Sequence, residues 1–424
     1  MHNNVKKAPF TWGPISKKQL QMLSWWHPSS PHNDKDGIIA DGSVRSTKTL
    51  SLSFSFLEWA ENTFQNPVLG ASGKTIKSFE RNVLGQLKQV ALGRGYTYQH
   101  NKSDNFIIFT RGNNSVTIYI FGGKDEASQD LVQGITLAGF LFDEVALQPE
   151  SFVHQAIARC SIDGSKLWFN CNPAGPYHYF KVNFLDKCNE LNLLHIHTTI
   201  DDNLTLSDRI KARYKRMYSG VFYKRYILGQ WVAADGLVYD MFDEQQHVVH
   251  EPDKHSRYVV GVDVGTANPT AFVRVGITGR NAQVVDEWYY DGRKNKQKTD
   301  AEFAVELERF VGGDKSTEII VDPSALSFKT ELRRRGFTRV RDAKNSVLDG
   351  IRFVASMLHA DKLTVCSKCA NLIQEFTSYL WDTKAQDRGE DKPAKEHDHA
   401  LDALRYVLFT LLGRSQGGNQ EFRL

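Results

Sequence analysis

The chain has 424 residues, of which 41% are hydrophobic and 11% aromatic, and its formal net charge at pH 7 is +4. This length predicts two or three domains with sizeable cores, and the small net charge excludes a protein that coats nucleic acid through its overall charge. Apolar runs stay below the roughly 18 residues of a membrane span, and the first residues lack the apolar core of a signal peptide, so we expect a soluble protein that is not exported.

The cysteines are odd in number and scattered, which predicts reduced thiols in a cytoplasmic setting. Cys366 and Cys369 have the spacing of metal ligands, but no second pair completes a zinc site, and we expect none there. The five positions are Cys160, Cys171, Cys188, Cys366 and Cys369.

The first predicted helix lies between Phe10 and Trp26 and carries an amphipathic pattern around Leu20. Gln19 lies on this helix. Its side-chain amide offers both a donor and an acceptor, which suits the adenine edge of a nucleotide. A surface glutamine on a helix explains the same position, so both interpretations stay open.

Residues 41–49 predict a phosphate-binding loop, called the phosphate loop below. They follow a short apolar run and precede a helical pattern over 50–64. In such a loop backbone N–H groups surround the phosphates, a lysine neutralises them and a hydroxyl binds Mg²⁺. Lys48 is the expected lysine and Thr49 the expected magnesium hydroxyl. The predicted ATP-binding residues of the loop are Gly42, Ser43, Val44, Arg45, Ser46, Thr47, Lys48 and Thr49.

One position departs from the pattern, because Thr47 stands where a glycine is expected before the lysine. A β-branched residue is costly if the backbone there needs a positive φ. An ordinary loop between a strand and a helix is therefore the alternative explanation of this segment.

Next, two β-rich runs at 105–110 and 115–121 predict a hairpin, and an apolar strand at 137–142 ends in Asp143 and Glu144. Carboxyl ends of buried strands are where α/β sheets place their ligands. We expect Asp143 to contact the magnesium shell and Glu144 to orient or deprotonate the attacking water. An acidic pair that begins a surface loop is the alternative, but the phosphate loop upstream favours catalysis.

A further strand at 166–171 ends in Asn172, and Pro173, Pro176 and His178 follow. A polar Asn at a strand end beside a nucleotide can sense the γ-phosphate. The first half of the chain thus contains three motifs: a phosphate loop, an apolar strand ending in Asp-Glu, and then Asn-Pro-x-x-Pro-x-His. Their order and spacing resemble the ATPase half of phage terminase large subunits, which pump DNA into proheads. The resemblance implies that Asn172 couples hydrolysis to movement.

Two arginines compete for the role of stabilising charge on the transferred phosphate. Arg45 lies in the phosphate loop and would act in cis, as the resemblance implies, whereas Arg159 would reach a neighbouring subunit; a solvated surface position explains either. Downstream, residues 201–229 mix basic and aromatic side chains, which suits a helical subdomain near DNA phosphates or a solvated basic face. Residues 231–257 have weak periodicity and are expected to be a linker.

Three consecutive strands at 258–263, 270–277 and 283–290, with Asp263 on the first, suggest a sheet of the ribonuclease H type. Another strand at 318–321 ends in Asp322. On the last predicted helix His399 and Asp402 are three residues apart and share one face. Two carboxylates about 4 Å apart repel by on the order of 4 kcal/mol at an effective dielectric near 20, and divalent cations relieve this repulsion. Two magnesium or manganese ions would then hydrolyse a phosphodiester.

This half also resembles the terminase nuclease domain, down to Pro393, Lys395 and the Asp-His-Ala-x-Asp-Ala-x-Arg-Tyr run near its end. The resemblance covers residues 10–412 and is closest to headful-packaging phages of Gram-positive hosts. It implies that Asp263, Asp322 and Asp402 carry the metal ions and that His399 is a ligand or supports one.

Together these patterns predict an α/β protein: a P-loop ATPase domain with a central, mainly parallel sheet at 1–230, the linker at 231–257, a ribonuclease H-like nuclease domain at 258–412 and a flexible tail at 413–424. The implied cofactors are ATP with Mg²⁺ and two Mg²⁺ or Mn²⁺ ions at the nuclease site. The implied partners are double-stranded DNA, the portal protein, the small terminase subunit and further copies in a ring on the prohead, in the cytoplasm of the infected host.

Two other functions fit parts of the sequence. A DNA-binding nuclease scaffold would have an N-terminal domain that binds nucleotide but does not hydrolyse it, because Thr47 alters the loop. A junction resolvase shares the second type of sheet, but it leaves the first half of the chain unexplained.

Overall fold

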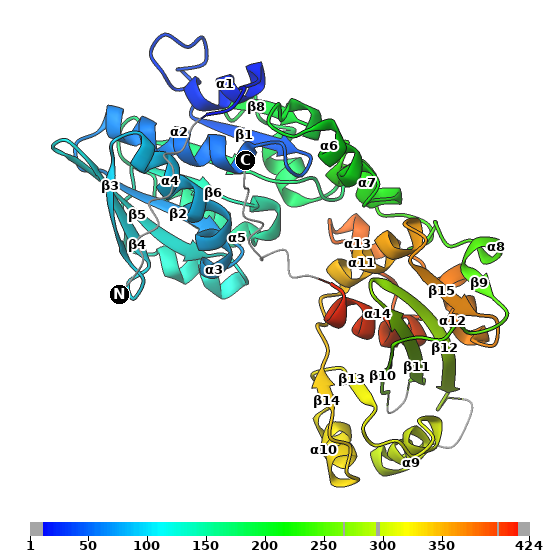
Figure 1. Cartoon of the computed structure of the whole chain (residues 1–424). Helices are drawn as coiled ribbons and strands as arrows, with labels where there is room; N and C mark the ends of the chain where they lie inside the picture. The colour runs from blue at the N-terminus through cyan, green and yellow to red at the C-terminus, as the bar shows by residue number, and fades with distance from the viewer. Residues whose placement is uncertain (1–11, 266–267, 294–296, 397, 414–424) are drawn as a thin grey trace, which may run out of the picture. The chain divides into compact units, whose positions relative to one another are not determined.

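The computed structural model describes residues 12–265, 268–293, 297–396 and 398–413, and these form two compact units (Figure 1). The first contains the described residues up to Lys215, together with Tyr223–Ala233 and Asp387–Glu390. The second contains Arg216–Phe222, Ala234–Gln386 and the described residues from Asp391 onward. The predicted tail beyond Gly413 lies outside the described residues. No helix in the described ranges is long and apolar enough to cross a membrane.

The first unit is built on a sheet of eight described strands in the order β3-β4-β5-β2-β6-β7-β1-β8. β3 and β4, and β4 and β5, pair antiparallel, and every other neighbouring pair is parallel. The strands are β1 (Gly37–Gly42), β2 (Val68–Gly73), β3 (Thr97–Asn101), β4 (Phe106–Arg111), β5 (Asn114–Gly122), β6 (Gly139–Phe142), β7 (Lys166–Asn170) and β8 (Leu193–Thr198).

Helices cover both faces of this sheet (Figure 1). They are α1 (Lys17–Ser24), α2 (Lys48–Thr63), α3 (Ile76–Phe79), α4 (Gly85–Gly93) and α5 (Glu150–Ile157). Two further helices follow β8: α6 (Asp208–Lys215), which has no buried residue, and α7 (Gly220–Tyr226), whose residues are divided between the two units. The predicted helix over 50–64 is α2, and the predicted hairpin is β4 and β5.

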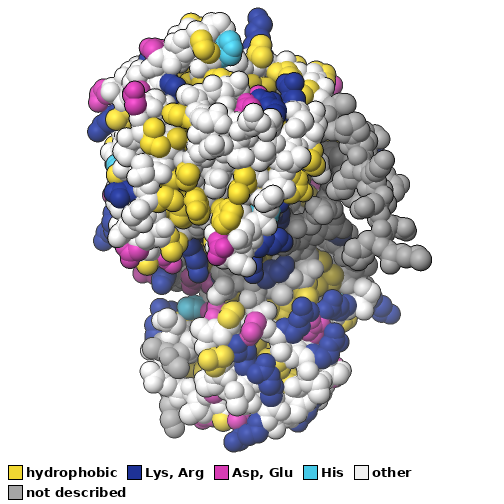
Figure 2. Space-filling view, turned by 90° about the vertical axis from the view of Figure 1, so that its left-hand side faces the viewer, with side chains coloured by type: hydrophobic (Ala, Val, Ile, Leu, Met, Phe, Trp, Pro, Cys, Tyr) yellow, Lys and Arg dark blue, Asp and Glu magenta, His cyan; other side chains and the backbone are white. Residues whose placement is uncertain are grey.

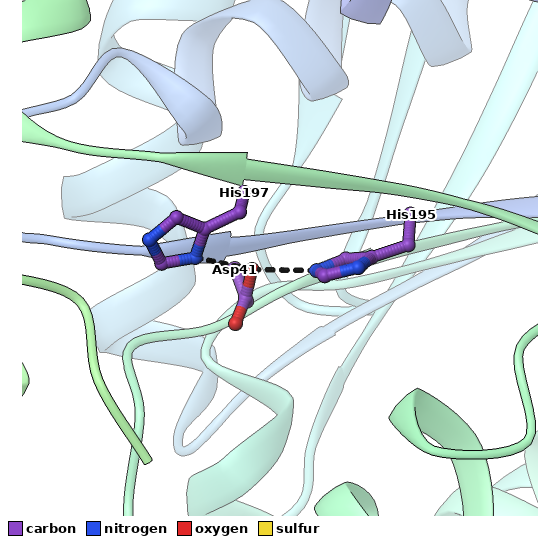
Figure 3. Close-up of side chains that lie close together, drawn as sticks. All are labelled: Asp41, His195 and His197. Carbon is purple, nitrogen blue, oxygen red and sulfur yellow. Dashed lines mark hydrogen bonds and ion pairs between the residues drawn. The ribbon is translucent and has the colours of Figure 1, made fainter.

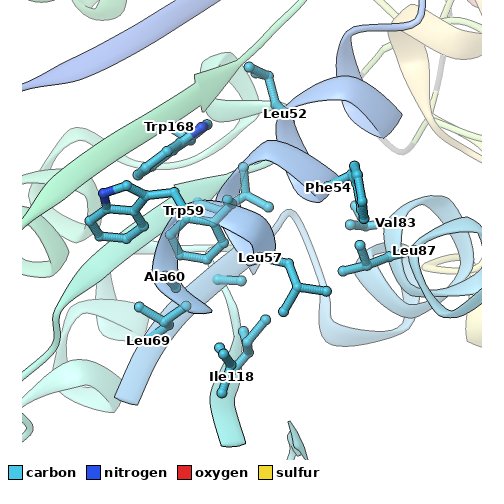
Figure 4. Close-up of a cluster of buried hydrophobic side chains, with 14 of the residues drawn as sticks. Leu52, Phe54, Leu57, Trp59, Ala60, Leu69, Val83, Leu87, Ile118 and Trp168 are labelled. Atoms are coloured by element: carbon cyan, nitrogen blue, oxygen red, sulfur yellow. The ribbon is translucent and has the colours of Figure 1, made fainter. Parts of the chain in front are cut away.

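Alternating side chains of the central strands enter two different cores, which is why these strands are apolar almost throughout. Leu141 and Trp168 pack with α2 on one face, and Phe142 and Phe169 pack with α5 on the other. Figure 4 shows the first of these cores, in which the rings of Trp59 and Trp168 lie 4.6 Å apart. Burial on both faces holds the carboxyl ends of β1, β6 and β7 together.

The second unit is built on a mixed sheet of seven described strands in the order β14-β13-β10-β11-β12-β15-β9. β11 pairs antiparallel with β10 and β12, and the remaining pairs are parallel. The strands are β9 (Val248–Val249), β10 (Arg257–Asp263), β11 (Thr270–Thr278), β12 (Asn281–Tyr290), β13 (Glu318–Val321), β14 (Val340–Asp342) and β15 (Leu363–Cys366).

The helices of this unit are α8 (Glu244–His247), α9 (Asp300–Phe310), α10 (Leu326–Arg334), α11 (Val347–His359), α12 (Ala370–Ser378), α13 (Thr383–Asp387) and α14 (His399–Leu411). The expected linker, residues 231–257, contains α8 and β9, and β9 is one of the two edge strands of the second sheet.

Helix α14 lies directly on β10, and a glycine makes this contact close. A Cβ added to Gly261 would lie 2.0 Å from the backbone oxygen of Ala403, so no larger residue fits without moving the helix. The close approach brings the first turns of α14, which carry His399 and Asp402, to the strand that carries Asp263.

Candidate functional site

The phosphate loop joins the end of β1 to the start of α2 through a backbone with repeated positive φ angles. Gly42 has φ +130°, and a Cβ there would lie 1.8 Å from the Thr198 oxygen, so only glycine fits. Arg45 and Thr47 have φ of 60° and 72°. The left-handed backbone expected of the glycine in this pattern is therefore present at Thr47, and its hydroxyl donates to the Ser46 oxygen at 2.5 Å.

Lys48 is buried, and its ammonium group is held at the mouth of the loop by four oxygens. Nζ donates to the backbone oxygens of Ser43 at 2.6 Å and Gly42 at 3.2 Å, to Ser46 Oγ at 3.1 Å and to Asn172 Oδ1 at 3.2 Å. Burial lowers the pKa of Lys48 to about 8, although nearby acidic groups oppose the change. A buried cation of this kind favours an anionic ligand.

Asp143 follows β6 and lies beside Thr49 at the start of α2. Thr49 Oγ1 is 3.4 Å from Asp143 Oδ1, and the amide of Asn170 donates to both, at 2.8 Å and 2.6 Å respectively. Burial and the charge of Glu144 raise the pKa of Asp143. Glu144 has a φ of 54°, a strained conformation that is frequent at functional sites.

Sequence reasoning missed Asn170, the last residue of β7, because a single buried Asn has no distinctive spacing. Its position two residues before Asn172 was the available signal.

Gln19 is only 3% exposed, so the surface-residue interpretation is wrong. Its Oε1 is buried and has no hydrogen-bond partner among the described residues. The helix α1 that carries it is held by Ser16, whose hydroxyl accepts the Gln19 backbone N–H at 3.2 Å. A buried amide oxygen that lacks a protein donor fits an external ligand with an N–H group.

The two candidate arginines lie in different places. Arg45 is exposed in the loop; its Nε donates to the hydroxyl of Tyr214 on α6 at 2.9 Å, and Asn203 donates to its backbone oxygen at 2.7 Å. The Arg159 backbone oxygen accepts the N–H of Leu137, just before β6. Arg159 therefore lies at the end of β6 opposite to Asp143, away from the phosphate loop of its own chain. Helix α6 has no buried residue.

In the second unit, Asp263 at the end of β10 meets His399 at the start of α14. His399 Nδ1 lies 2.9 Å from Asp263 Oδ2; burial of His399 opposes its protonation, but this contact raises the pKa of His399 overall. Asp402, one turn further along α14, forms an ion pair with Arg405 at 2.9 Å. Burial, together with the charges of Asp263 and Asp398, raises the pKa of Asp402 to about 6.

Asp322 follows β13 and is held by two neighbours. Tyr406 donates its hydroxyl to Oδ2 at 2.9 Å, and the backbone N–H of Ser324 donates to Oδ1 at 2.7 Å. Burial opposes ionisation of Asp322, but the hydrogen bonds from Ser324 and Tyr406 lower its pKa overall. Burial and the negative charges of Asp263, Asp402 and Asp322 raise the pKa of Tyr406, so all three predicted acids act on its hydroxyl group.

Arg405 and Tyr406 were not predicted as site residues. The sequence did offer a signal for them: Arg405 and Tyr406 follow Asp402 by three and four residues on one helix, so their side chains lie on the same face as Asp402.

One further group has ligand atoms close together. Asp41, His195 and His197 bring three such atoms within 4.8 Å of one another, and they alone do so among the described residues (Figure 3). Among the described residues, the ligand atoms of Asp263, Asp322, Asp402 and His399 in the second unit do not form a group of three within this distance. Sequence reasoning did not identify this group, because β8, which carries both histidines, was not predicted.

A model for the N-terminal part of terminase large subunits of the T4-like-virus type matches residues 40–246, and a model for the terminase RNase H-like domain matches residues 260–411. A solved large terminase from a thermophilic bacteriophage is 54% identical, with a TM-score of 0.90 over 94% of this chain and all of that one. The chain belongs to the terminase large subunits of phages.

Structures of the same thermophilic-phage terminase with ADP and with ATP-γ-S are each 52% identical to this chain, with a TM-score of 0.87 over the same shares of both chains. The terminase large subunit of Escherichia phage T5 is 26% identical over 351 residues, which are 78% of this chain and 76% of that protein. This terminase is thus an ATPase with a ribonuclease H-like nuclease domain, and the predicted family and fold class are confirmed.

Proposed function

We propose that the first unit hydrolyses ATP with Mg²⁺ to move double-stranded viral DNA into a prohead. The observation that carries this proposal is the position of Lys48, buried among loop oxygens at the end of β1, beside Thr49 and Asp143. Lys48 would neutralise the phosphates, and Thr49 and Asp143, which offer the oxygen ligands that magnesium prefers, would hold the ion. The ion would polarise the phosphate oxygens during transfer.

Other residues complete this proposal. Glu144 orients or deprotonates the attacking water, Arg45 stabilises charge in cis, and Gln19 reads the adenine edge. The backbone of Gly42, Ser43, Val44, Ser46 and Thr47 surrounds the phosphates. The complexes of the thermophilic-phage terminase with ADP and ATP-γ-S support the proposal that this chain binds an adenine nucleotide.

Asn172 is the proposed coupling residue, because its Oδ1 contacts Lys48 Nζ. A γ-phosphate would compete for the same ammonium group. Its arrival and loss would therefore release and restore the contact with Asn172, and this change would pass to the loop that follows β7.

The second unit, we propose, cuts concatemeric DNA with two Mg²⁺ or Mn²⁺ ions. Asp263, Asp322 and Asp402, with His399 as a ligand or supporting group, offer the oxygen-rich set that such ions prefer, and their mutual repulsion favours a bound cation. The ions would activate a water and stabilise the leaving oxygen. Tyr406, Arg405 and Ser324 hold the carboxylates in place.

Charge on the second unit suits a DNA backbone. Lys and Arg side chains gather on the lower part of the face in Figure 2, which is the second unit. Its exposed arginines include Arg334, Arg339 and Arg341, with side chains 79%, 56% and 55% exposed. Such groups bind phosphates without reading sequence.

We further propose the domain boundaries 1–230 and 258–412, and action in the cytoplasm of the infected bacterium. The proposed partners are the portal, the small terminase subunit and further copies of this chain in a ring.

ATP hydrolysis in the presence of DNA and portal tests the first part. Lys48→Ala and Glu144→Ala should each abolish turnover, because one removes the phosphate cation and the other the group that activates water. The exposed Lys102→Ala is the control and should hydrolyse ATP like the wild type. Absence of turnover in the wild type itself would contradict the motor and favour the nuclease scaffold.

DNA cleavage with Mn²⁺ or Mg²⁺ tests the second part, in the full chain and in the segment from about Val232 onward. Asp322→Ala should be inactive because it loses a proposed metal ligand. The control is Asp349→Ala, which removes an exposed carboxylate of α11 and should cut normally. If Asp322→Ala cut DNA as fast as the wild type, this result would contradict the proposal that Asp322 binds a catalytic metal ion.

A further inference from the structure

A second cluster of metal-ligand side chains lies at the start of the phosphate loop, and it shares no residue with the proposed Mg²⁺ ligands or with the proposed nuclease site. His195 and His197 are two residues apart on β8 and therefore point to the same face of the sheet. β8 pairs in parallel with β1, and the register places Asp41 beside His197. The three side chains converge from these two strands (Figure 3).

The ligand atoms of the Asp41 cluster, which consists of Asp41, His195 and His197, lie within 4.8 Å of one another. Asp41 Oδ1 lies 2.8 Å from His195 Nε2 and 3.0 Å from His197 Nδ1. Tetrahedral coordination with bonds of about 2.0–2.2 Å places ligand atoms about 3.3–3.5 Å apart. Each contact would therefore lengthen by roughly 0.3–0.7 Å to admit an ion.

A neighbouring group holds the carboxylate of Asp41 in the orientation that a metal site needs. The indole N–H of Trp231 donates to Asp41 Oδ2 at 2.8 Å, which leaves Oδ1 directed at the histidines. Such outer partners orient the ligands of metal sites in proteins.

The cluster is anchored on one side and open on the other. The Asp41 side chain is 2% exposed, whereas those of His195 and His197 are 33% and 40% exposed. The open side gives an ion an entry path and leaves a coordination position for water.

We propose that Asp41, His195 and His197 bind one transition-metal ion of the zinc class. Two imidazoles and one carboxylate suit Zn²⁺, Co²⁺ or Ni²⁺, whereas Mg²⁺ prefers oxygen ligands alone. The ion would join β8 to the residue that precedes Gly42. The site is distinct from the Mg²⁺ ligands Thr49 and Asp143, and its occupancy does not depend on the proposed ATP chemistry.

Zinc titration of the full chain tests this proposal by calorimetry, after chelator treatment and with Mg²⁺ in excess. With Mg²⁺ in excess, the wild type should bind one more Zn²⁺ tightly than either His195→Ala or His197→Ala, whatever the proposed nuclease site binds. His195→Ala and His197→Ala should each bind this ion at least about a hundredfold more weakly, because removal of an outer partner alone costs roughly 10–100-fold in related sites. The visible absorption that Co²⁺ gives with the wild type should be weaker in both variants by the contribution of one ion, because the proposed nuclease site remains intact in them.

His154→Ala is the matched control, since its side chain is 58% exposed on α5 and outside the cluster. It should bind Zn²⁺ like the wild type. Circular dichroism of the metal-free variants establishes that they are folded. Equal zinc affinity in the wild type and in folded His197→Ala would overturn the proposal, and so would a wild type that binds no Zn²⁺ at millimolar concentration; the cluster would then be a hydrogen-bonded link between β8 and β1.

Discussion

At the scale of single residues, the backbone at Thr47 shows how the unusual phosphate loop is built. A β-branched residue occupies a left-handed conformation with φ 72°, which costs roughly 1–2 kcal/mol for a residue other than glycine. The backbone is left-handed at a residue that does not favour this conformation, and the loop is fixed at both ends by β1 and α2.

This conformation predicts an unusual order of stability at position 47. Thr47→Gly should have a free energy of unfolding about 0.5–1 kcal/mol higher than Thr47→Ala, because relief of the left-handed backbone outweighs the extra chain entropy of glycine. Thermal denaturation of the two variants, followed through the transition of the first unit, measures the difference. A less stable Thr47→Gly would show that the backbone at this residue is not left-handed.

At the scale of elements, one buried carboxylate fastens three strands of the second unit. Glu318 begins β13, its side chain is 2% exposed, and it accepts hydrogen bonds from Arg257 on β10, from Arg341 on β14 and from Arg339 beside it. Burial opposes ionisation, but the bonds from Arg257 and Arg341 lower the pKa of Glu318 overall.

Glu318→Gln should lower the free energy of unfolding by about 1.5–3 kcal/mol at neutral pH, the usual worth of hydrogen bonds to a charged group. Because the pKa is lower in the folded state, the stabilisation is present above the ordinary pKa of a glutamate and is lost as the pH falls through the lowered value. Denaturation of both proteins across this range checks the expectation, and the difference should vanish in acid.

The matched control is Glu308→Gln, since Glu308 is 31% exposed and pairs with Lys315 and Arg335 at the surface. Its effect should stay below about 1 kcal/mol. An equal loss in both variants would mean that Glu318 is no more than another surface ion pair.

At the scale of the whole molecule, the two units do not divide the chain at one point. Residues 216–222 belong to the second unit, although Tyr223–Ala233, which follow them directly in the chain, belong to the first. Phe222 is 5% exposed there, its ring lies 6.2 Å from that of Trp381, and the guanidinium of Arg352 lies 5.6 Å from it.

A fragment that begins at residue 216 should therefore be more stable than one that begins at residue 232. The expected difference in free energy of unfolding is about 3–5 kcal/mol, the usual cost of removing a buried Phe side chain. Thermal denaturation of the two fragments measures it, and Phe222→Ala in the longer fragment should reproduce most of the loss. Fragments of equal stability would place residues 216–222 outside the second unit.

The sequence by itself determined the features that depend on local spacing. The phosphate loop between strand and helix, the apolar strand that ends in Asp143 and Glu144, and the ribonuclease H-like order of strands were all visible, because apolar periodicity and strand-end polar residues are properties of short segments. These patterns also predicted that the chain belongs to the terminase large subunits, and the comparisons confirm this family.

Only the tertiary structure decided which distant side chains meet. The burial of Gln19, the approach of His195 to Asp41 and the bond from Tyr406 to Asp322 each join segments far apart in the chain. The physical reason is that the neighbours of a parallel strand depend on the crossover connections and on the register between strands. Neither of these can be read from the residue pattern of a short segment.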